Sequence, residues 1–599
     1  MKKCLTLTIF LFLIVSAKAQ NSSVENQILL GNFLNDIENT FAFSDSWFSK
    51  NLLFGQSPYN STALKYNNVY LNSMVDGSMR PDYLIPHNSS FIANRSKPDL
   101  YSTSNSLGAY IDINKPSYDT NLFKAVIQGG NIFGSNMVDY YGKKKNWRWN
   151  SSINYITSEN FDKSSSHDYS TGLTRINSDF RSFSGNLRVG VYDNNSMLDA
   201  EFIYTSSVTG IPFELNKQNA VLIREPDYKF NLLNIQFASS LNSNFKIEGN
   251  LFYIRNKTII ESSLKSIVDS DSTYKKSFEE NKFGWNSRLI IKNSLLPPTE
   301  ISFNYSREAL KYQANQGLSV EQYEIEKLVT GIKMYDKFEY WSYDIAIKYM
   351  LHNPLTILHN NLAQSNSNIE YYSDFDISVF KQVSLLLNHS RISVLPPLYY
   401  TYPSLNHGLI PINDKSFGTK YSYSLGVNLK MQELSSLELH FFHEQSSNQH
   451  LPYSLLNYNH EMIPDGINSN GMRFCLKSDL YIFKLHSNLD YYTENVQIFD
   501  SYGREIAIPS LQVHFRVFDE YNFGLKWLME YSHAGDRKSV LGEAVIEDFS
   551  LINLHLCYKV YKQNELFVSI NNLGDVNYEF IKGYPMPGIN FIAGFKLIL

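Results

Sequence analysis

The chain holds few residue groupings whose types and spacing could carry out catalysis. His443-Glu444 begins like the metal-binding helix of a zinc protease, but Ser447 stands where the second histidine would have to be. A Gly-x-Ser-x-Gly elbow, a phosphate-binding Walker loop and a Cys-x-x-Cys pair are all missing from the sequence. We therefore expect no enzyme, with no catalytic residue, no metal centre and no cofactor.

Aromatic and imidazole side chains that could contact a ligand gather in two long polar segments. Such side chains suit a metal chelate or another planar solute. They equally suit the rim of a membrane protein, where aromatic residues anchor at the lipid interface. Both interpretations remain open, and the candidate ligand-binding residues are Tyr399, Tyr400, Tyr402, His407, His450, Tyr453 and His460.

The first residues have the pattern of a cleaved signal peptide. Lys2 and Lys3 form a basic start, the segment Leu5–Val15 is apolar apart from threonine, and Ala17-Lys18-Ala19 supplies small residues where a signal peptidase cuts. The apolar run is shorter than the roughly 20 residues that a transmembrane helix needs. We expect residues 1–19 to be removed and the mature protein to leave the cytoplasm.

The composition of the mature chain excludes several classes of protein. Only Cys475 and Cys557 remain after residue 20, so the chain is not a disulfide-stabilised scaffold. A formal net charge of −5 gives no basic stripe, so nucleic acid is not an expected partner. The 42 tyrosines and 39 phenylalanines are dispersed along the chain. Dispersed apolar residues are typical of a membrane barrel, whose strands show every second residue to lipid.

Apolar residues at every second position form the strongest pattern in the chain. Residues 341–349 read Trp-Ser-Tyr-Asp-Ile-Ala-Ile-Lys-Tyr, so a strand here would have one apolar and one mostly polar face. Residues 523–531 alternate in the same way, and 187–204 form two such runs around a turn at 193–196. The pattern predicts antiparallel strands joined by turns.

Loop lengths distinguish a membrane barrel from a soluble sandwich. Short and long connections alternate along the chain, as do the periplasmic turns and extracellular loops of an outer-membrane barrel. Short connections are expected at 193–196, 241–244, 293–299, 335–338, 380–382, 431–435 and 561–565. Long connections are expected at 207–227, 258–280, 351–369, 391–420, 446–467, 532–548 and 571–590.

The expected fold is an all-β membrane protein with a 22-stranded antiparallel transmembrane β-barrel. An even strand number returns both ends of the barrel to the periplasmic side. The strands are expected to begin near 122, 136, 147, 184, 197, 228, 245, 281, 300, 326, 339, 370, 383, 421, 436, 468, 483, 506, 522, 549, 566 and 591.

The last residues carry a recognisable order of motifs. Residues 566–599 contain Asn572-Leu573-Gly574-Asp575, then Tyr578, then Gly583-Tyr584-Pro585-Met586-Pro587-Gly588, and end on an alternating strand. This order resembles the C-terminus of the TonB-dependent outer-membrane receptors. Leu599 stands where that family prefers an aromatic residue.

An N-terminal segment resembles the plug domain of the same family. Its similar motifs include Asn67-Asn68-Val69-Tyr70-Leu71-Asn72, Asp76-Gly77 and the run from Ser106 to Ile113. Several glycines of the family are replaced, and the start of the mature chain shows no convincing TonB box. The resemblance implies a signal peptide at 1–19, a shortened plug at 20–115 and a barrel at 116–599.

The resemblance implies a function in uptake. In the family, a scarce substrate binds outside the cell, and plug rearrangement driven through the TonB complex releases it inward. Iron chelates, cobalamin, glycans and peptides all fit such a fold. The implied partners are outer-membrane lipid, an extracellular solute or chelate, and the TonB complex, in the outer membrane of a Gram-negative cell. The alternatives are a non-energised surface-binding barrel, a passive channel with a vestigial plug, and a hydrolase built in a barrel.

Overall fold

The computed structural model consists of β-structure throughout the residues that it describes. No helix in those residues is long and apolar enough to cross a membrane. The described residues are 40–44, 50–54, 62–73, 90–95, 109–114, 121–159, 161–162, 174–175, 178–211, 221–264, 274–293, 296–314, 320–356, 366–394, 418–432, 435–447, 468–480, 483–493, 497–499, 505–507, 509–535, 537, 546–581 and 583–599.

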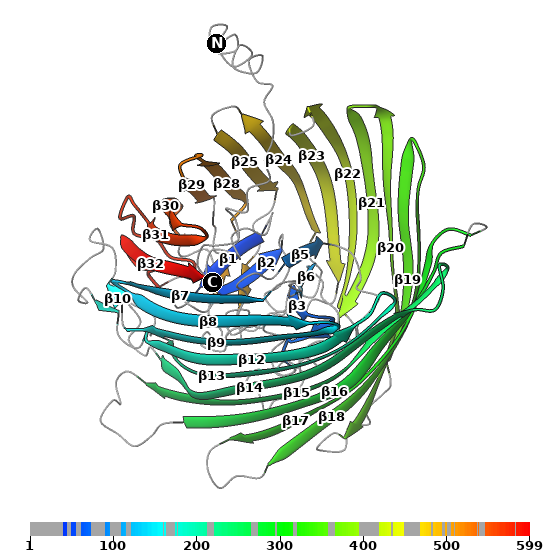
Figure 1. Ribbon diagram of the computed structural model, residues 1–599, viewed down its shortest axis with the longest axis horizontal. Coiled ribbons are helices and arrows are strands. Elements are labelled where there is room, and N and C mark those ends of the chain that lie inside the picture. Colours follow the sequence, from blue (N-terminus) through cyan, green and yellow to red (C-terminus); the bar gives the residue numbers. More distant parts are fainter. Residues whose placement is uncertain are drawn as a thin grey trace, which may run out of the picture.

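Twenty-two of the described strands close into one antiparallel barrel (Figure 1). The predicted fold class and strand number are therefore confirmed. Two hairpins, β10 (Phe161–Asp162) with β11 (Thr174–Arg175) and β26 (Gln497–Phe499) with β27 (Glu505–Ala507), lie within connections. The barrel strands are β7 (Leu122–Gly130), β8 (Phe133–Lys144), β9 (Trp147–Ser158), β12 (Phe180–Tyr192), β13 (Ser196–Ile211), β14 (Val221–Ser240), β15 (Phe245–Leu264), β16 (Tyr274–Ile291), β17 (Thr299–Ala314), β18 (Glu321–Lys337), β19 (Trp341–Thr356), β20 (Asn366–Phe380), β21 (Val383–Val394), β22 (Gly418–Gln432), β23 (Ser435–Ser447), β24 (Asn468–Leu480), β25 (Phe483–Tyr492), β28 (Leu511–Glu520), β29 (Leu525–Gly535), β30 (Phe549–Tyr561), β31 (Asn564–Asn571) and β32 (Asn590–Ile598).

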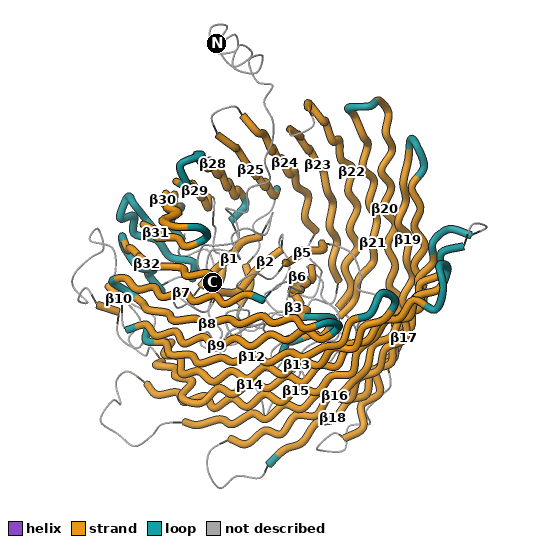
Figure 2. The backbone as a smooth tube through the Cα atoms, viewed as in Figure 1, coloured by secondary structure: helices purple, strands orange, loops and turns teal. Residues whose placement is uncertain are grey.

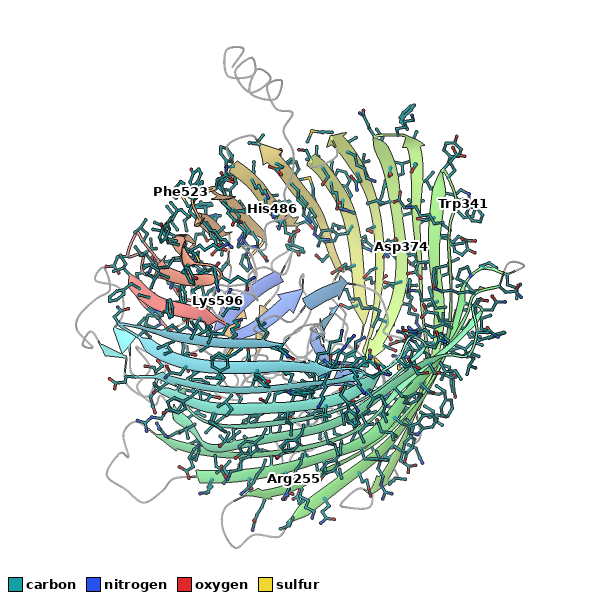
Figure 3. All side chains as sticks on the ribbon, in the orientation of Figure 1. Arg255, Trp341, Asp374, His486, Phe523 and Lys596 are labelled. Atoms are coloured by element: carbon teal, nitrogen blue, oxygen red, sulfur yellow. The ribbon has the colours of Figure 1, made fainter. Side chains whose placement is uncertain are left out.

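Alternating burial explains why these strands form a membrane barrel. In β19, Trp341, Ile347 and Tyr349 are exposed, whereas Lys348 and Met350 are completely buried. Figure 3 shows Trp341 on the outer side of the wall. The apolar face therefore points outward and the polar face inward. Lipid can cover such an outer face, and ring closure leaves no unpaired strand edge in the hydrocarbon.

The connections alternate in length as the sequence predicts, with small shifts in position. The short connection expected at 335–338 lies at 338–340, between β18 and β19. Strands β14 and β16 begin at Val221 and Tyr274, earlier than predicted. At the long-loop end both faces of a strand meet water, so the alternation that marks the strand stops before the strand does.

One strand begins later than its pattern suggested. Strand β28 starts at Leu511, whereas a start near 506 was expected. Residues 505–507 instead form β27, which pairs with β26 within the long connection between β25 and β28.

Stacked aromatic residues mark the short-turn end of the barrel. The rings of Phe338 and Trp341 lie 4.6 Å apart, and those of Trp341 and Tyr343 lie 5.5 Å apart. At another short turn, the rings of Tyr521 and Phe523 stack 5.4 Å apart. Aromatic side chains favour the boundary between lipid and water, so these rings mark one border of the membrane.

Six short strands lie inside the barrel (Figures 1 and 2). Strands β1 (Thr40–Ser44) and β2 (Lys50–Phe54) form a hairpin. Strands β3 (Thr62–Tyr66), β4 (Val69–Tyr70), β5 (Ser90–Arg95) and β6 (Ala109–Asn114) form a sheet in the order β4-β3-β6-β5. We call this four-stranded unit the inner sheet. All six strands fall in the segment whose motifs resemble a plug.

The barrel closes where β32 pairs with β7. The backbone groups of Phe123 and Leu599 exchange two hydrogen bonds, with N···O distances of 3.1 and 2.9 Å. At the other end of this pair, a Cβ on Gly130 would lie 1.9 Å from the carbonyl oxygen of Phe591. The neighbouring Gly129 has no atom within 4 Å of the same position. Glycine at 130 therefore permits the close approach of the first and last strands.

Replacing Gly130 with alanine is expected to destabilise the closed barrel by about 1–3 kcal/mol, because backbone atoms must move to admit the methyl group. The matched control is Gly129→Ala, which meets open space and should leave stability unchanged. Denaturant unfolding in lipid vesicles, followed by the mobility shift of folded barrel on gels, measures both. Equal stability of the two variants would contradict the close approach.

Candidate functional site at the contact between the inner sheet and the barrel wall

A two-residue turn after β3 is the part of the inner sheet that reaches the barrel wall. Asn67 and Asn68 have positive φ angles of 45° and 66°, and Tyr66 pairs with Val69 across them. Two positive φ angles in a two-residue hairpin loop are the type I′ geometry, which asparagine adopts more readily than most residues. The sequence thus places two asparagines at the tip of the hairpin.

Glu201 of β13 forms hydrogen bonds with this tip. The Tyr66 hydroxyl donates to Oε1 at 2.8 Å, and the Asn67 side-chain amide donates to Oε2 at 2.7 Å. The Asn186 amide from β12 also donates to Oε1. Glu201 is only 3% exposed, so these donors replace the water that its carboxylate loses. Burial and the Glu201 carboxylate raise the pKa of Tyr66 well above its ordinary value, which keeps the hydroxyl a donor.

Side-chain amides of the wall also donate to the backbone of the turn. The Asn67 carbonyl oxygen accepts from Asn234 at 3.1 Å and from Gln236 at 2.8 Å. The Asn68 carbonyl oxygen accepts from Asn286 at 2.9 Å. Because the tip is a turn, its carbonyl groups are not used by a sheet ladder and are available to the wall.

Three asparagines form a continuous row across β14, β15 and β16, which we call the asparagine row. Asn250 donates to Asn234 at 3.0 Å, and Asn286 donates to Asn250 at 3.1 Å. The strand register explains the row, because Asn234 is directly opposite Glu201 and Asn250 is directly opposite Asn286. All three side chains are nearly completely buried.

The contact continues along the wall beyond the turn. Lys282 of β16 donates to the carbonyl oxygen of Asn72, and the Ser73 hydroxyl donates to Glu280 at 2.8 Å. Asn256 of β15 donates to the same Glu280 oxygen at 3.3 Å. We call residues 66–73 the anchor segment, since they contact the wall from β13 to β16.

The chemistry of the anchor segment is reversible binding. Each neutral hydrogen bond contributes about 0.5–1.5 kcal/mol net, and each bond to a charged group about 1.5–3 kcal/mol. The separated groups can bond to water in a wet lumen, so these hydrogen bonds can break and form again. The arrangement can therefore hold the inner sheet in place and also let it move.

The rest of the lumen wall carries paired charges. On β28 to β30, Arg516 donates to Glu530 at 3.0 Å, and His555 lies 3.2 Å from the other oxygen of Glu530. On β24 and β25, Arg473 and Asp490 approach to 2.8 Å. Such a wall suits a hydrated path for a polar solute.

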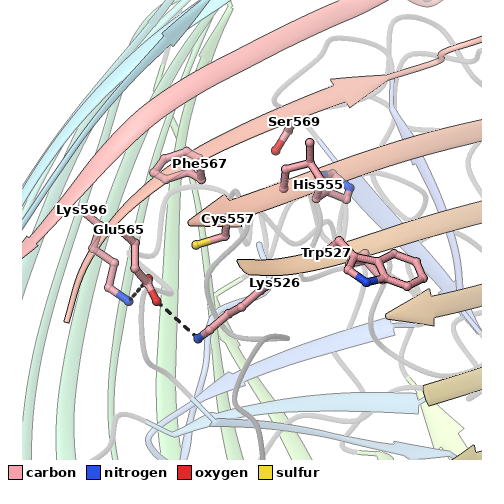
Figure 4. A pocket seen from close by; sticks show the side chains of 10 residues that line it. Lys526, Trp527, His555, Cys557, Glu565, Phe567, Ser569 and Lys596 are labelled. Atoms are coloured by element: carbon pink, nitrogen blue, oxygen red, sulfur yellow. Dashed lines mark hydrogen bonds and ion pairs between the residues drawn. The ribbon is translucent and has the colours of Figure 1, made fainter. Parts of the chain in front are cut away.

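A small pocket lies on the lumen face of β29 to β32 (Figure 4). Lys526 and Lys596 both contact Glu565, with N···O distances of 3.3 and 3.1 Å. Cys557 and His555 also line it. Among the described residues, no group of three or more His, Cys, Asp or Glu side chains is placed to hold a metal ion.

The seven ligand-binding residues predicted from the sequence lie outside the described residues and stay predictions. Their segments, 395–417 and 448–467, connect β21 to β22 and β23 to β24. The sequence analysis missed the anchor segment as a site, although it identified residues 67–72 as plug-like. Consecutive asparagines at a hairpin turn were the available signal. The residues concerned are Tyr399, Tyr400, Tyr402, His407, His450, Tyr453 and His460.

Known structures share this architecture, whereas no family model and no curated protein sequence matches the chain. The copper transporter OprC is 10% identical with a TM-score of 0.77, covering 95% of this chain and 98% of OprC. The FrpB iron transporter from Neisseria meningitidis (F3-3 variant) is 10% identical with a TM-score of 0.77, covering 95% and 96%.

A third similar structure is a mutant of the ferric enterobactin receptor PfeA from Pseudomonas aeruginosa, in complex with enterobactin. It is 10% identical with a TM-score of 0.72, covering 96% of this chain and 97% of PfeA. All three proteins are TonB-dependent receptors, and none is described as an enzyme. The protein therefore has the fold of the TonB-dependent receptors, as its C-terminal and plug-like motifs indicated.

Replacing Glu201 with alanine is expected to loosen the inner sheet, because Tyr66 and Asn67 lose a charged acceptor worth about 1.5–3 kcal/mol. Amide hydrogen exchange of residues 62–70 should become roughly 10- to 100-fold faster. The control is Glu530→Ala, an equally buried carboxylate whose partners are Arg516 and His555 of the wall. Unchanged exchange in the Glu201 variant, or equal acceleration in both, would refute the anchor.

Proposed function

We propose that the protein is an outer-membrane receptor that imports a scarce solute through a plugged barrel. The observation that carries the proposal is the anchor segment, which holds the inner sheet in the lumen by bonds to wall side chains. A passive pore needs no internal sheet, and a surface-binding barrel needs no releasable one. We place the signal peptide at 1–19, the plug at 20–115 and the barrel at 116–599.

The proposed cargo is a metal chelate, with cobalamin, a glycan or a peptide as the other candidates. The comparable proteins are described as acting on copper, iron and ferric enterobactin. The two loops that carry the predicted tyrosines and histidines adjoin β21 to β24. Imidazoles also lie on the lumen wall of β23, β25, β28 and β30, where they suit chelates with oxygen or nitrogen ligands. They are His440, His486, His514 and His555.

The proposed energy source is the TonB complex, acting on the part of the chain before β3. The fold of TonB-dependent receptors supports this partner, whereas the lack of a convincing TonB box argues for a passive or surface-binding role. A pull on the plug would have to break the hydrogen bonds of the anchor, each of which is worth no more than about 3 kcal/mol. The anchor therefore matches a device that is closed at rest and opened by work.

The deciding experiment compares conductance of the full-length barrel with that of a variant lacking residues 20–115, both in planar bilayers. If the plug seals the lumen, the full-length protein is closed and the truncated protein conducts strongly. Equal conductance would mean that the plug is not a gate, and the passive or surface-binding role would replace uptake. Failure of both to insert would contradict the membrane barrel itself.

A reversible lock tests whether the plug must move. Cysteines at Asn68 and Asn286, in a background with Cys475 and Cys557 changed to serine, should be joined by a short bifunctional methanethiosulfonate cross-linker, because the Asn286 side chain contacts the Asn68 backbone. Moderate urea weakens the polar anchor and should open the unlocked channel. The cross-linked double variant should stay closed in urea and open after reductant removes the cross-link. The single variant Asn68→Cys is the control, and opening of the cross-linked protein would contradict a moving plug.

A further inference from the structure

A row of alternating tyrosine and histidine rings lies on the outer face of the barrel, across β20 to β23. His389 stacks on Tyr423 at 4.6 Å and meets Tyr371 edge-on at 5.3 Å. Tyr423 in turn stacks on His443 at 6.2 Å. The strand register accounts for the row, because Tyr423 is directly opposite both His389 and His443.

The row lies at the long-loop border of the apolar outer face. On the turn side, the residues on the same face are Leu387, Leu425 and Phe441, all well exposed. On the loop side, Arg391 is directly opposite Tyr421, and its guanidinium lies 5.8 Å from that ring. The face thus changes from purely apolar side chains to tyrosine and histidine rings and then to a cation toward the outside of the cell.

Several polar groups of this face lack hydrogen-bond partners among the described residues. Arg391 donates through Nη1 to the carbonyl oxygen of Ile369 at 2.8 Å, but its Nε has no partner among the described residues. The Nε2 atom of His389 is likewise buried and without a hydrogen bond there. His443 bonds Asn470 through Nδ1 at 2.8 Å, which leaves its Nε2 available. The outer end of the Arg391 guanidinium on β21 and the Nε2 atom of His443 on β23 can therefore take an additional ligand.

Among the residues that the structure describes, no carboxylate on this face balances the charge of Arg391. The described acidic residues of β20 to β23 are all at even-numbered positions, on the lumen side. Arg391 and its neighbours in the row are at odd-numbered positions, on the outer side. The acidic residues are Glu370, Asp374, Asp376, Glu438 and Glu444.

Another part of the barrel wall at the same border is built differently. There Arg255 lies 2.9 Å from Glu279, and Arg307 bonds Glu324. Figure 3 shows Arg255 on the outer surface. The cations of β15 and β17 carry their own counter-charges, so the unbalanced arginine is a local feature of β21.

A charge at the lipid border needs a partner. Arginine near hydrocarbon is costly unless a headgroup or a carboxylate neutralises it. Its guanidinium binds phosphate strongly, through parallel charge-assisted hydrogen bonds. A phosphate at this height belongs to a lipid of the outer leaflet, whose acyl chains would cover Leu387, Leu425 and Phe441.

We propose that Arg391 and His443 form a binding site for the phosphate groups of an outer-leaflet glycolipid. Arg391 supplies the charge, the His443 imidazole supplies a hydrogen bond, and the tyrosine rings support the sugar plane. The apolar face below holds the acyl chains. This site is independent of the cargo and of the plug.

Native mass spectrometry of the purified full-length protein, titrated with lipid A in detergent, tests the site. Arg391→Gln is expected to weaken binding of bisphosphorylated lipid A by about fivefold or more, because a charge-assisted bond is lost. Arg391→Lys should retain part of the affinity. The matched control Arg307→Gln should bind as the parent does, since Arg307 is already paired with Glu324. Equal mobility of folded barrel on gels confirms that all variants fold.

Dephosphorylated lipid A and inorganic phosphate complete the test. Dephosphorylated lipid A should bind the parent as weakly as bisphosphorylated lipid A binds the Arg391→Gln variant. The protein should not retain inorganic phosphate alone, because free phosphate lacks the acyl chains that would pack on the apolar face. Equal lipid binding by the parent and the Arg391 variant, binding independent of phosphate, or retention of free phosphate would each overturn the proposal.

Discussion

The requirement that every backbone N–H and C=O group in hydrocarbon be bonded within the protein determines most of this structure. A sheet meets it only when the last strand pairs with the first, as β32 does with β7. Closure with 22 strands encloses a wide lumen, and the same period-two alternation that presents tyrosine and leucine to lipid presents lysine, glutamate and asparagine to that lumen. A polar interior is thus the consequence of an apolar exterior.

A wide polar lumen leaves a protein two options, which are to conduct or to be filled. In this chain, strands β1 to β6 lie in the lumen. The anchor segment attaches the inner sheet to side-chain amides and carboxylates of the wall. The hydrogen bonds between the wall and the anchor segment are ones that water can also make. The barrel is stabilised by the backbone hydrogen bonds between its neighbouring strands. The inner sheet can therefore move without weakening the membrane-spanning part.

The fold could be predicted from the sequence because its signals are local. The alternation at 341–349 and the order of short and long connections depend on neighbours in the chain. The anchor could not be predicted, because Tyr66 and Glu201 are 135 residues apart and Asn68 and Asn286 are 218 residues apart. Their meeting depends on how the inner sheet is seated against the wall, and no local pattern encodes that. Strand ends beyond the membrane were missed because the alternation fades there.

The order of contacts along the anchor segment has a mechanical consequence. From Tyr66 to Ser73 the bonds follow one another from β13 to β16, and the N-terminal end of the segment holds the Glu201 contact. Tension applied from the N-terminal side would reach the Glu201 contacts of Tyr66 and Asn67 first, then the contact of Asn68 with Asn286, and then that of Asn72 with Lys282. Bonds that break one after another require only the force of the strongest single step, whereas bonds loaded together in shear would resist with their sum. The attachment is thus stiff against diffusion of the whole sheet but yields to a modest directed pull.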